Sequence, residues 1–192
     1  MKKLLIVTMI FVTACLLQAC SGNVKNDSEP DADSTVGLKD TLPKPGAPIE
    51  KEDAQFAFKA ASGGLTEVAL GKLAQQRGEN IRVKNFGMMM VKDHSKANLK
   101  LAALAKSKNI ILPASPAADD QKMLDELSKK SGKDFDKAYV DDMINDHKND
   151  IKEFIYASKN CSDADLKAFA AKTLPVLKNH LDAVKTIHDS MK

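Results

Sequence analysis

Four long stretches of the chain repeat apolar residues at spacings of three and four, the pattern of an amphipathic α-helix. This pattern predicts helices over residues 53–76, 80–108, 134–159 and 163–190 of the 192-residue sequence. After the N-terminal segment, no run alternates apolar and polar residues as a β-strand would. Such a chain must bury four helical stripes against one another, which predicts an all-α four-helix bundle.

The connections between these segments predict how the helices pair. Short turns at residues 77–79 and 160–162 make the flanking helices antiparallel neighbours. The link over residues 109–133 is much longer and contains a short amphipathic segment at about 118–130. Two antiparallel hairpins joined by one long crossover form the ferritin-like arrangement. We therefore expect a ferritin-like four-helix bundle over residues 51–192, with a short helix in its crossover.

The first predicted helix contains three glycines that lower its intrinsic stability. Gly63, Gly64 and Gly71 lie inside it, and each costs about 1 kcal/mol relative to Ala in a helix. We expect these glycines to let a neighbouring helix approach closely beside Glu67.

The first twenty residues have the features of a bacterial lipoprotein signal. Lys2 and Lys3 give a positive start, and an apolar run of about fourteen residues ends in Leu-Gln-Ala-Cys at Cys20. The run is shorter than the roughly twenty residues that span a bilayer. Its end resembles the lipobox, whose Cys becomes the acylated first residue of the mature protein; the alternative is a simple secretory signal. We expect residues 1–19 to be a lipoprotein signal peptide and Cys20 to carry the lipid.

The residues after Cys20 indicate where the protein is held. Residues 20–50 are rich in Pro, Ser, Asp and Lys, which predicts a disordered tether between lipid and domain; their acidic bias could instead be an export signal. Ser21 favours the outer membrane by the rule for enterobacterial lipoproteins. The expected partner is thus the membrane, reached through the lipid anchor, in the periplasm or at the cell surface. The net charge of +3 falls to +1 without Lys2 and Lys3, which gives no electrostatic case for nucleic-acid binding.

One polar residue interrupts the apolar stripe of each long helix at a similar height. These residues are Glu67, His94, His147 and His180. At a rise of about 1.5 Å per residue they fall within a few ångströms of one mid-bundle layer. A buried carboxylate without a partner is costly, and four such groups can solve this by meeting around a metal. We predict that they bind one transition-metal ion (Cu, Fe, Zn or Mn); the alternative is a metal-free hydrogen-bonded core network.

A short repeat, Met-x-x-Asp-His, surrounds two of these histidines. Met90 and Met143 lie four residues before the histidine on the same helical face, so they are further candidate ligands that would favour copper. Asp93 and Asp146 directly precede the histidine, and we expect them to orient a ligand or to pair with an adjacent helix.

Two other residues of reactive type have simpler interpretations. Cys161 is the one cysteine left after signal removal and acylation of Cys20, so an intrachain disulfide is excluded. Because no histidine lies near it in sequence, we interpret Cys161 as a turn residue rather than a catalytic thiol. His188, near the C-terminus, is most simply a surface residue.

Several segments together resemble a known bacterial envelope family, the domain of unknown function 4142, which is a ferritin-like group. The segments are Ala-Ser-Gly-Gly-Leu-Thr-Glu67-Val, Phe86 through Met90 to Asp93-His94, Phe135-Asp136 with Tyr139, Met143 to His147, and Leu174-Pro175 with His180-Leu181. The resemblance covers about Gln55 to Ile187. It implies a helical bundle related to ferritin-like proteins and supplies no activity. The chain lacks the Glu-x-x-His pairs of di-iron proteins, so a single ion suits it better.

These observations predict a lipid-anchored envelope protein that binds one transition metal. Its role would be metal handling or protection against envelope stress, the latter by fold analogy alone. The alternative is a non-catalytic structural or interaction module whose Glu/His layer is a metal-free core network. The sequence shows no phosphate loop, nucleophile elbow or paired catalytic carboxylates. An enzymatic role would require metal-dependent redox chemistry at an open coordination position.

Overall fold

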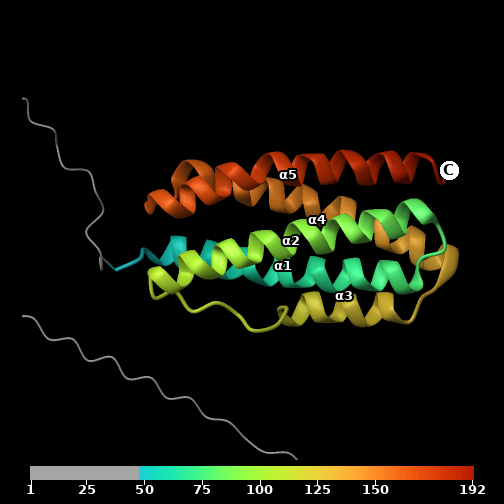
Figure 1. Cartoon of the computed structure of the whole chain (residues 1–192), viewed down its shortest axis with the longest axis horizontal. Helices are drawn as coiled ribbons and strands as arrows, with labels where there is room; N and C mark the ends of the chain where they lie inside the picture. Colours follow the sequence, from blue (N-terminus) through green and yellow to red (C-terminus); the bar gives the residue numbers. More distant parts are fainter. Residues whose placement is uncertain (1–47) are drawn as a thin grey trace, which may run out of the picture. The chain divides into compact units, whose positions relative to one another are not determined.

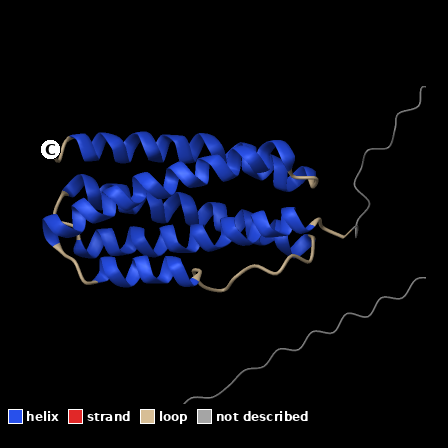
Figure 2. Cartoon of the chain, turned by 180° about the vertical axis from the view of Figure 1, so that it is seen from behind, coloured by secondary structure: helices blue, strands red, loops and turns tan. Residues whose placement is uncertain are grey.

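The computed structural model describes residues 48–192, and over this range the only regular structure is helical (Figures 1 and 2). The helices are α1 Lys51–Arg77, α2 Ile81–Ser107, α3 Ala118–Ser128, α4 Gly132–Asn160 and α5 Ala164–Asp189. The four long helices begin and end within two residues of the predicted bounds. None of the described helices is long and apolar enough to cross a membrane. The predicted signal peptide, Cys20 and nearly all of the predicted tether lie outside the described residues.

The helices pack as two antiparallel hairpins. Helix α1 packs along α2, and α4 packs along α5; α1 also contacts α4, and α2 contacts α5. Helices α1 and α5 therefore occupy diagonal corners of the bundle. The long crossover carries α3 back along the outside, where it lies against α1 and α4 (Figure 1). The predicted ferritin-like arrangement, with its short crossover helix, is confirmed.

A reciprocal pair of buried aspartates ties the two hairpins together. Asp136, near the start of α4, accepts hydrogen bonds from two backbone N–H groups of the α1–α2 turn, the shortest from Asn80 at 2.7 Å. Asp53, near the start of α1, does the same for the α4–α5 turn, with the shorter bond from Asp163 at 2.6 Å. The N–H groups that each carboxylate satisfies lie at the N-terminus of α2 or of α5, where a negative charge is favourable. The register between the hairpins is therefore fixed at both ends of the bundle.

The two hairpins also repeat one another. One separation in sequence, 83 residues, relates the two tying aspartates and also the two N-cap residues, Asn80 and Asp163. Under this relation Glu67 of α1 corresponds to Asp150 of α4. An approximate two-fold relation thus places a carboxylate at matching positions on these two neighbouring helices.

Apolar side chains fill the bundle on both sides of its middle. One cluster contains Leu70, Phe86, Phe135 and Tyr139, and the other contains Phe56, Leu101, Phe154 and Leu177. The predicted polar layer lies between the two clusters. It is therefore enclosed along the bundle axis by close-packed apolar side chains.

The glycines of α1 have different roles. A Cβ atom on Gly71 would lie 2.6 Å from the backbone oxygen of Gly87 in α2, and a Cβ on Gly64 would collide with the side chain of Asn98. These two glycines permit the close approach of α2 that the sequence predicts. For Gly63 the prediction is wrong, because a Cβ there would meet nothing within 4 Å.

Candidate metal centre

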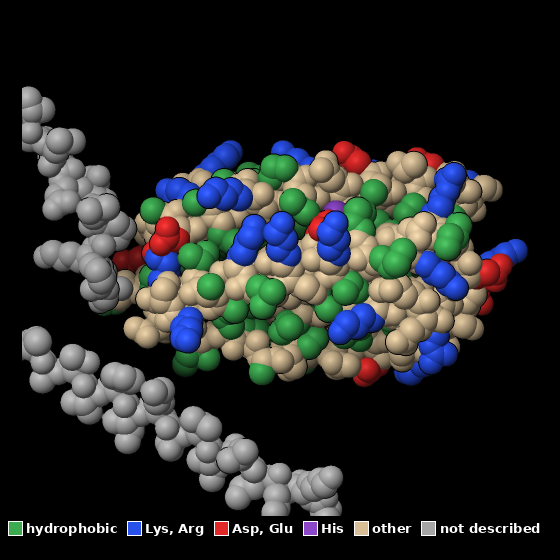
Figure 3. Space-filling model, viewed as in Figure 1, with side chains coloured by type: hydrophobic (Ala, Val, Ile, Leu, Met, Phe, Trp, Pro, Cys, Tyr) green, Lys and Arg blue, Asp and Glu red, His purple; other side chains and the backbone are tan. Residues whose placement is uncertain are grey.

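Three histidines from three helices meet in the middle of the bundle. His94 of α2, His147 of α4 and His180 of α5 are 6%, 0% and 1% exposed. Nδ1 of His180 lies 3.3 Å from Nε2 of His94 and 3.3 Å from Nε2 of His147. These three nitrogens form a compact set, all within 4.8 Å of one another. Only a trace of histidine surface reaches the face shown in Figure 3, among scattered Lys and Arg side chains.

In His147 and His180, the ring nitrogen outside this compact set has an oxygen partner. That partner determines which of the two ring nitrogens carries the hydrogen. Nδ1 of His147 lies 3.0 Å from the backbone oxygen of Met143, which only accepts, so this nitrogen is the donor. Nε2 of His180 lies 3.1 Å from the carboxylate of Asp93 and donates to it. A neutral imidazole carries one hydrogen, so Nε2 of His147 and Nδ1 of His180 both present lone pairs. These two lone pairs face each other at 3.3 Å with no hydrogen between them.

The environment keeps these imidazoles neutral. Burial lowers the pKa of His94 to about 4 and, together with the neighbouring histidines, lowers the pKa of His147 to about 3. Burial also lowers the pKa of His180. Neutral imidazoles bind transition metals, whereas protonated ones do not. Near pH 7, therefore, the cluster offers nitrogen lone pairs rather than positive charge.

The spacing of the nitrogens fits a metal ion. Metal–imidazole bonds of about 2.0–2.1 Å in tetrahedral geometry separate neighbouring nitrogens by about 3.3–3.4 Å. The two nitrogen pairs that share His180 have this separation, 3.3 Å. Each histidine also uses its second nitrogen to contact an oxygen atom, which is how metal-binding imidazoles are commonly oriented.

Glu67 lies beside this set rather than within it. Its Oε2 is 2.6 Å from Nδ1 of His94, the nitrogen turned away from the other two histidines. Its Oε1 is 3.5 Å from Nε2 of His147 and has no hydrogen-bond partner among the described residues. Because α1 is diagonal to α5, Glu67 does not join the compact set that contains His180. The four predicted residues therefore meet in two overlapping sets, the three histidines and Glu67 with Asp146 and His147, and metal ligation by any of them stays a prediction.

The residues predicted to support the ligands separate into two groups. Asp93 accepts the hydrogen of His180, an orienting contact between α2 and α5 of the predicted kind. Asp146 instead turns toward α1, where its carboxylate forms a second compact set with Glu67 and His147. Met90 and Met143 are fully buried in the apolar cluster beside the histidines. The observed contact of Met143 with His147 is through its backbone oxygen, and ligation by either sulfur stays a prediction.

Further carboxyl groups approach the same side of the centre. Burial, followed by the charges of Asp146 and Asp120, raises the pKa of Glu67 well above its usual value. Burial and the charge of Asp120 likewise raise the pKa of Asp146, to about 6. Burial and the charges of Glu67 and Asp146 raise the pKa of Asp150 well above its usual value. In the described part of the chain, none of Glu67, Asp146 and Asp150 pairs with a Lys or Arg side chain.

Sequence reasoning missed two residues of this region. Asp150 follows Asp146 by four residues, so it lies on the same face of α4, and this spacing could have revealed it. Tyr139 is fully buried, and its hydroxyl has no hydrogen-bond partner among the described residues. Burial and the charges of Glu67 and Asp146 raise the pKa of Tyr139. No sequence signal distinguishes Tyr139 from an ordinary core aromatic residue.

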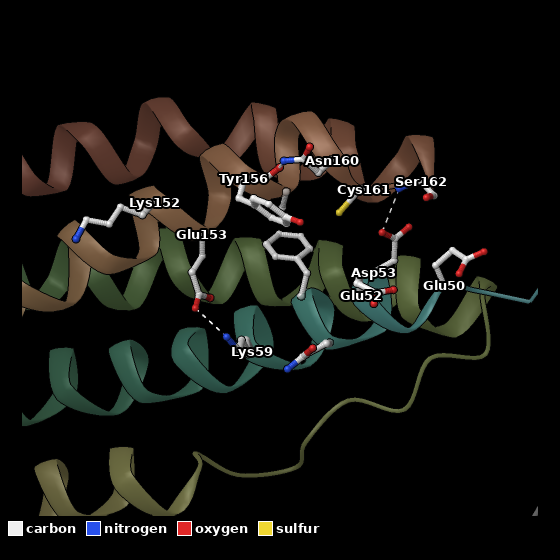
Figure 4. A pocket seen from close by; sticks show the side chains of 13 residues that line it. Glu50, Glu52, Asp53, Lys59, Lys152, Glu153, Tyr156, Asn160, Cys161 and Ser162 are labelled. Carbon is white, nitrogen blue, oxygen red and sulfur yellow. Dashed lines mark hydrogen bonds and ion pairs between the residues drawn. The ribbon is translucent and has the colours of Figure 1, made fainter.

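Cys161 lies far from the histidines, at the C-terminal end of α4. It lines a groove of about 580 Å³ between the start of α1 and the end of α4, which Figure 4 shows from close by. Lys59 and Glu153 form an exposed ion pair at 3.0 Å in this groove. Burial and the neighbouring carboxylate of Asp53 raise the pKa of the Cys161 thiol to about 12. Such a thiol is a poor nucleophile at neutral pH. His188, in contrast to the other histidines, is about one-third exposed, with 37% side-chain exposure.

The fold and the centre together define a class of protein: an all-helical bundle with a histidine cluster enclosed in its core. Residues 40–187 match the family described as domain of unknown function DUF4142, and the chain belongs to this family. No curated protein matches the chain.

Two solved structures resemble this bundle. One is a DUF305 fragment from Deinococcus radiodurans, with a TM-score of 0.65 and 10% identity, covering 73% of this chain and 97% of that one. The other is a putative secreted DUF305 protein from Streptomyces coelicolor, with a TM-score of 0.63 and 11% identity, covering 73% and 93%. At these identities the likeness concerns the fold alone.

Proposed function

We propose that this protein is anchored by lipid in the bacterial envelope and that its bundle binds one transition-metal ion through His94, His147 and His180. Its role would be to handle that metal in the envelope or to protect the envelope against oxidative stress. The observation that carries the metal site is the 3.3 Å contact between two imidazole lone pairs, on His147 and His180. Lone pairs held this close repel each other, and a cation placed between them turns the repulsion into bonding.

The protons of the cluster explain how the site differs with and without metal. Burial favours the neutral forms of Glu67 and His94, so in the free protein Glu67 keeps a proton and donates it to Nδ1 of His94. Nε2 of His94 then carries hydrogen and donates to His180. Metal binding requires the lone pair of this nitrogen, so the hydrogen moves to Nδ1 and the proton of Glu67 is released.

The donor set limits the identity of the ion. Three imidazole nitrogens suit Zn, Cu or Fe better than Mg or Ca. Three protein ligands with a position left over is also the arrangement of catalytic rather than closed structural zinc sites. Redox chemistry at such a position would require Cu or Fe, and peroxide consumption by the loaded protein would reveal it.

Metal content is the experiment that tests this proposal. The chain would be purified without a histidine tag, loaded separately with Zn, Cu, Fe and Mn, and analysed for bound metal after dialysis. We expect about one tightly held ion per chain, lost in His180→Ala and retained in His188→Ala. His188 is the matched control because it is the one histidine outside the cluster. Equal metal content in both variants, with helicity unchanged, would instead favour the metal-free core network.

The lipid anchor requires a separate test, because residues 1–47 lie outside the described structure. The support for it is the lipobox-like sequence that ends at Cys20. The wild-type chain should incorporate labelled palmitate, and the labelled protein should fractionate with the outer membrane. Cys20→Ala should lose both the label and the membrane association, whereas Cys161→Ala should keep them. Retention of the label in Cys20→Ala would refute the anchor.

A further inference from the structure

The solvent-facing side of α2 exposes large apolar side chains that no other described helix covers. Helix α2 packs along α1 and against α5, whereas the crossover helix α3 lies against α1 and α4. Ile81, Met88 and Leu99 of α2 are 66%, 51% and 74% exposed. They are separated by seven and eleven residues, close to two and three turns of an α-helix. The three side chains therefore form one apolar stripe along the outside of α2.

Lysine side chains accompany this stripe. Lys92 and Lys106 each lie seven residues from Leu99 and so share its side of the helix, and Lys96 and Lys100 follow Lys92 at intervals of four. All four lysines are exposed, and none forms an ion pair with a described carboxylate. Figure 3 shows Lys and Arg side chains along the middle of the face on which α2 lies, with apolar side chains beside them. We call this lysine-flanked apolar stripe the outer face of α2.

The outer face of α2 is unfavourable for a bundle surrounded by water alone. Positive charges four residues apart on a helix repel each other, as in the row from Lys92 through Lys96 to Lys100. Leu99 also leaves most of its apolar surface in water, which forfeits the free energy of burial. No described part of the chain offsets either cost. A surface that is negatively charged outside and apolar beneath would offset both.

The charges of the helices are divided between opposite sides of the bundle. Helix α2 has six basic residues and one acidic residue, whereas α3 has one basic and four acidic residues and α4 has five basic and seven acidic residues. Helix α4 is diagonal to α2, and α3 packs on the side of α1 and α4. A negatively charged surface therefore attracts α2 and repels α3 and α4, which orients the bundle.

We propose that the outer face of α2 docks the bundle on an anionic phospholipid surface. The lysines contact headgroup phosphates, and Met88 and Leu99 enter the boundary between headgroups and acyl chains, as basic amphipathic helices do. For its cellular setting this inference rests on the proposed lipid anchor. Thirty residues separate Cys20 from α1, so an acylated Cys20 holds the bundle within about 100 Å of the bilayer. Docking places the seam between α2 and α5, where Asp93 contacts His180, beside the membrane surface.

Vesicle binding by a chain without lipid tests this docking separately from the anchor. Residues 20–192 carrying Cys20→Ala correspond to the chain after signal processing and contain every described helix. Co-sedimentation would compare vesicles of phosphatidylcholine with vesicles that also contain phosphatidylglycerol. We expect at least tenfold tighter binding to the anionic vesicles, and we expect added salt to weaken it. Equal binding to both kinds of vesicle would overturn the inference.

Two sets of substitutions locate the binding surface. Replacing Lys92, Lys96 and Lys100 together by Gln should weaken binding to anionic vesicles at least tenfold, because each basic residue near such a surface contributes about fivefold in affinity. The matched control removes the same charge from exposed lysines of α4: Lys148→Gln, Lys152→Gln and Lys159→Gln. It should bind within about twofold of the parent chain. Equal loss in the two triple variants, with helical content unchanged, would refute docking through α2.

The apolar stripe distinguishes a membrane from other negatively charged partners. Leu99→Gln keeps every charge and should weaken binding to anionic vesicles at least threefold, while binding to soluble heparin should stay the same. If Leu99→Gln binds the vesicles as the parent chain does, α2 is a general polyanion surface and the membrane assignment is wrong. If the parent chain binds no vesicles although wild type incorporates palmitate, docking is refuted and the lipid anchor stands.

Discussion

The glycines of α1 permit a sharp test of how the fold positions the centre. In Gly71→Ala the new Cβ would start 2.6 Å from the backbone oxygen of Gly87 and 3.0 Å from Val91 Cγ2. A backbone atom cannot rotate away, so α1 and α2 must separate by about 0.8 Å to reach ordinary van der Waals contact near 3.4 Å. Gly71 is one helical turn from Glu67. A separation of this size would stretch the 2.6 Å contact between Glu67 and His94 to about 3.4 Å, beyond good hydrogen-bond geometry.

Replacement by alanine should change the free energy of unfolding in opposite directions at two glycines of α1. Overpacking costs about 1–3 kcal/mol and the gain in helix propensity is about 1 kcal/mol, so Gly71→Ala should be destabilised by up to about 2 kcal/mol. Gly63→Ala gains the same propensity without a clash, because nothing lies within 4 Å of its Cβ. It should be more stable than wild type by up to about 1 kcal/mol.

Guanidinium denaturation followed by circular dichroism would measure both free energies of unfolding, with metal removed. Imidazole nitrogen NMR would report whether the His94–Glu67 hydrogen bond survives in each variant. We expect it to be lost in Gly71→Ala and kept in Gly63→Ala. The reasoning is refuted if both variants shift stability in the same direction, or if Gly71→Ala keeps both wild-type stability and the hydrogen bond.

Three further predictions concern other buried groups. Asp136→Ala should lower the free energy of unfolding by about 2–4 kcal/mol, measured by denaturation, because two turn N–H groups lose a charged acceptor. Asp134→Ala, in the first turn of the same helix, is the control. Cys161 should react with iodoacetamide at pH 8 far more slowly than in the unfolded chain, because its thiol is buried with a pKa near 12; labelling at the unfolded rate would contradict its burial. Asp146→Asn should become more stable than metal-free wild type by roughly 1–3 kcal/mol as the pH rises from 5 to 8. The sign follows because the folded-state pKa of Asp146 is raised to about 6: protonated Asp146 stabilises wild type at low pH, and this stabilisation is lost as the pH rises through that value. A stability difference between the two proteins that does not change with pH would be inconsistent with this.

The sequence predicted the helices well because each carries a continuous apolar stripe. Periodicity located all four long helices to within two residues, and loop lengths gave their pairing. The three histidines could be placed at one height by counting residues, since the rise of an α-helix is nearly constant. Counting does not reveal which helices are diagonal, however. For that reason Glu67 was expected in one set with all three histidines, whereas the structure places it beside His94 and His147 and outside the compact set that contains His180.

The carboxyl groups whose charges act on Glu67 and on one another show a second limit of sequence reasoning. Asp150 and Asp120 resemble solvent-facing acidic residues of amphipathic helices, and nothing local distinguishes them. Their convergence depends on the crossover, which brings α3 against α1 and α4. Gly63 was expected to admit a neighbouring helix, as Gly64 and Gly71 do, but a Cβ at Gly63 would meet nothing within 4 Å. Only the relative placement of three helices reveals this difference.

The most direct test of the central claim is X-ray absorption at the metal edge of the chain loaded with one equivalent of Zn²⁺. The structure predicts about three imidazole nitrogens at about 2.0–2.1 Å from the metal, and loss of one of them in His180→Ala but not in His188→Ala. A shell made only of oxygen atoms in wild type, or a spectrum unchanged by His180→Ala, would contradict a metal centre formed by the three histidines.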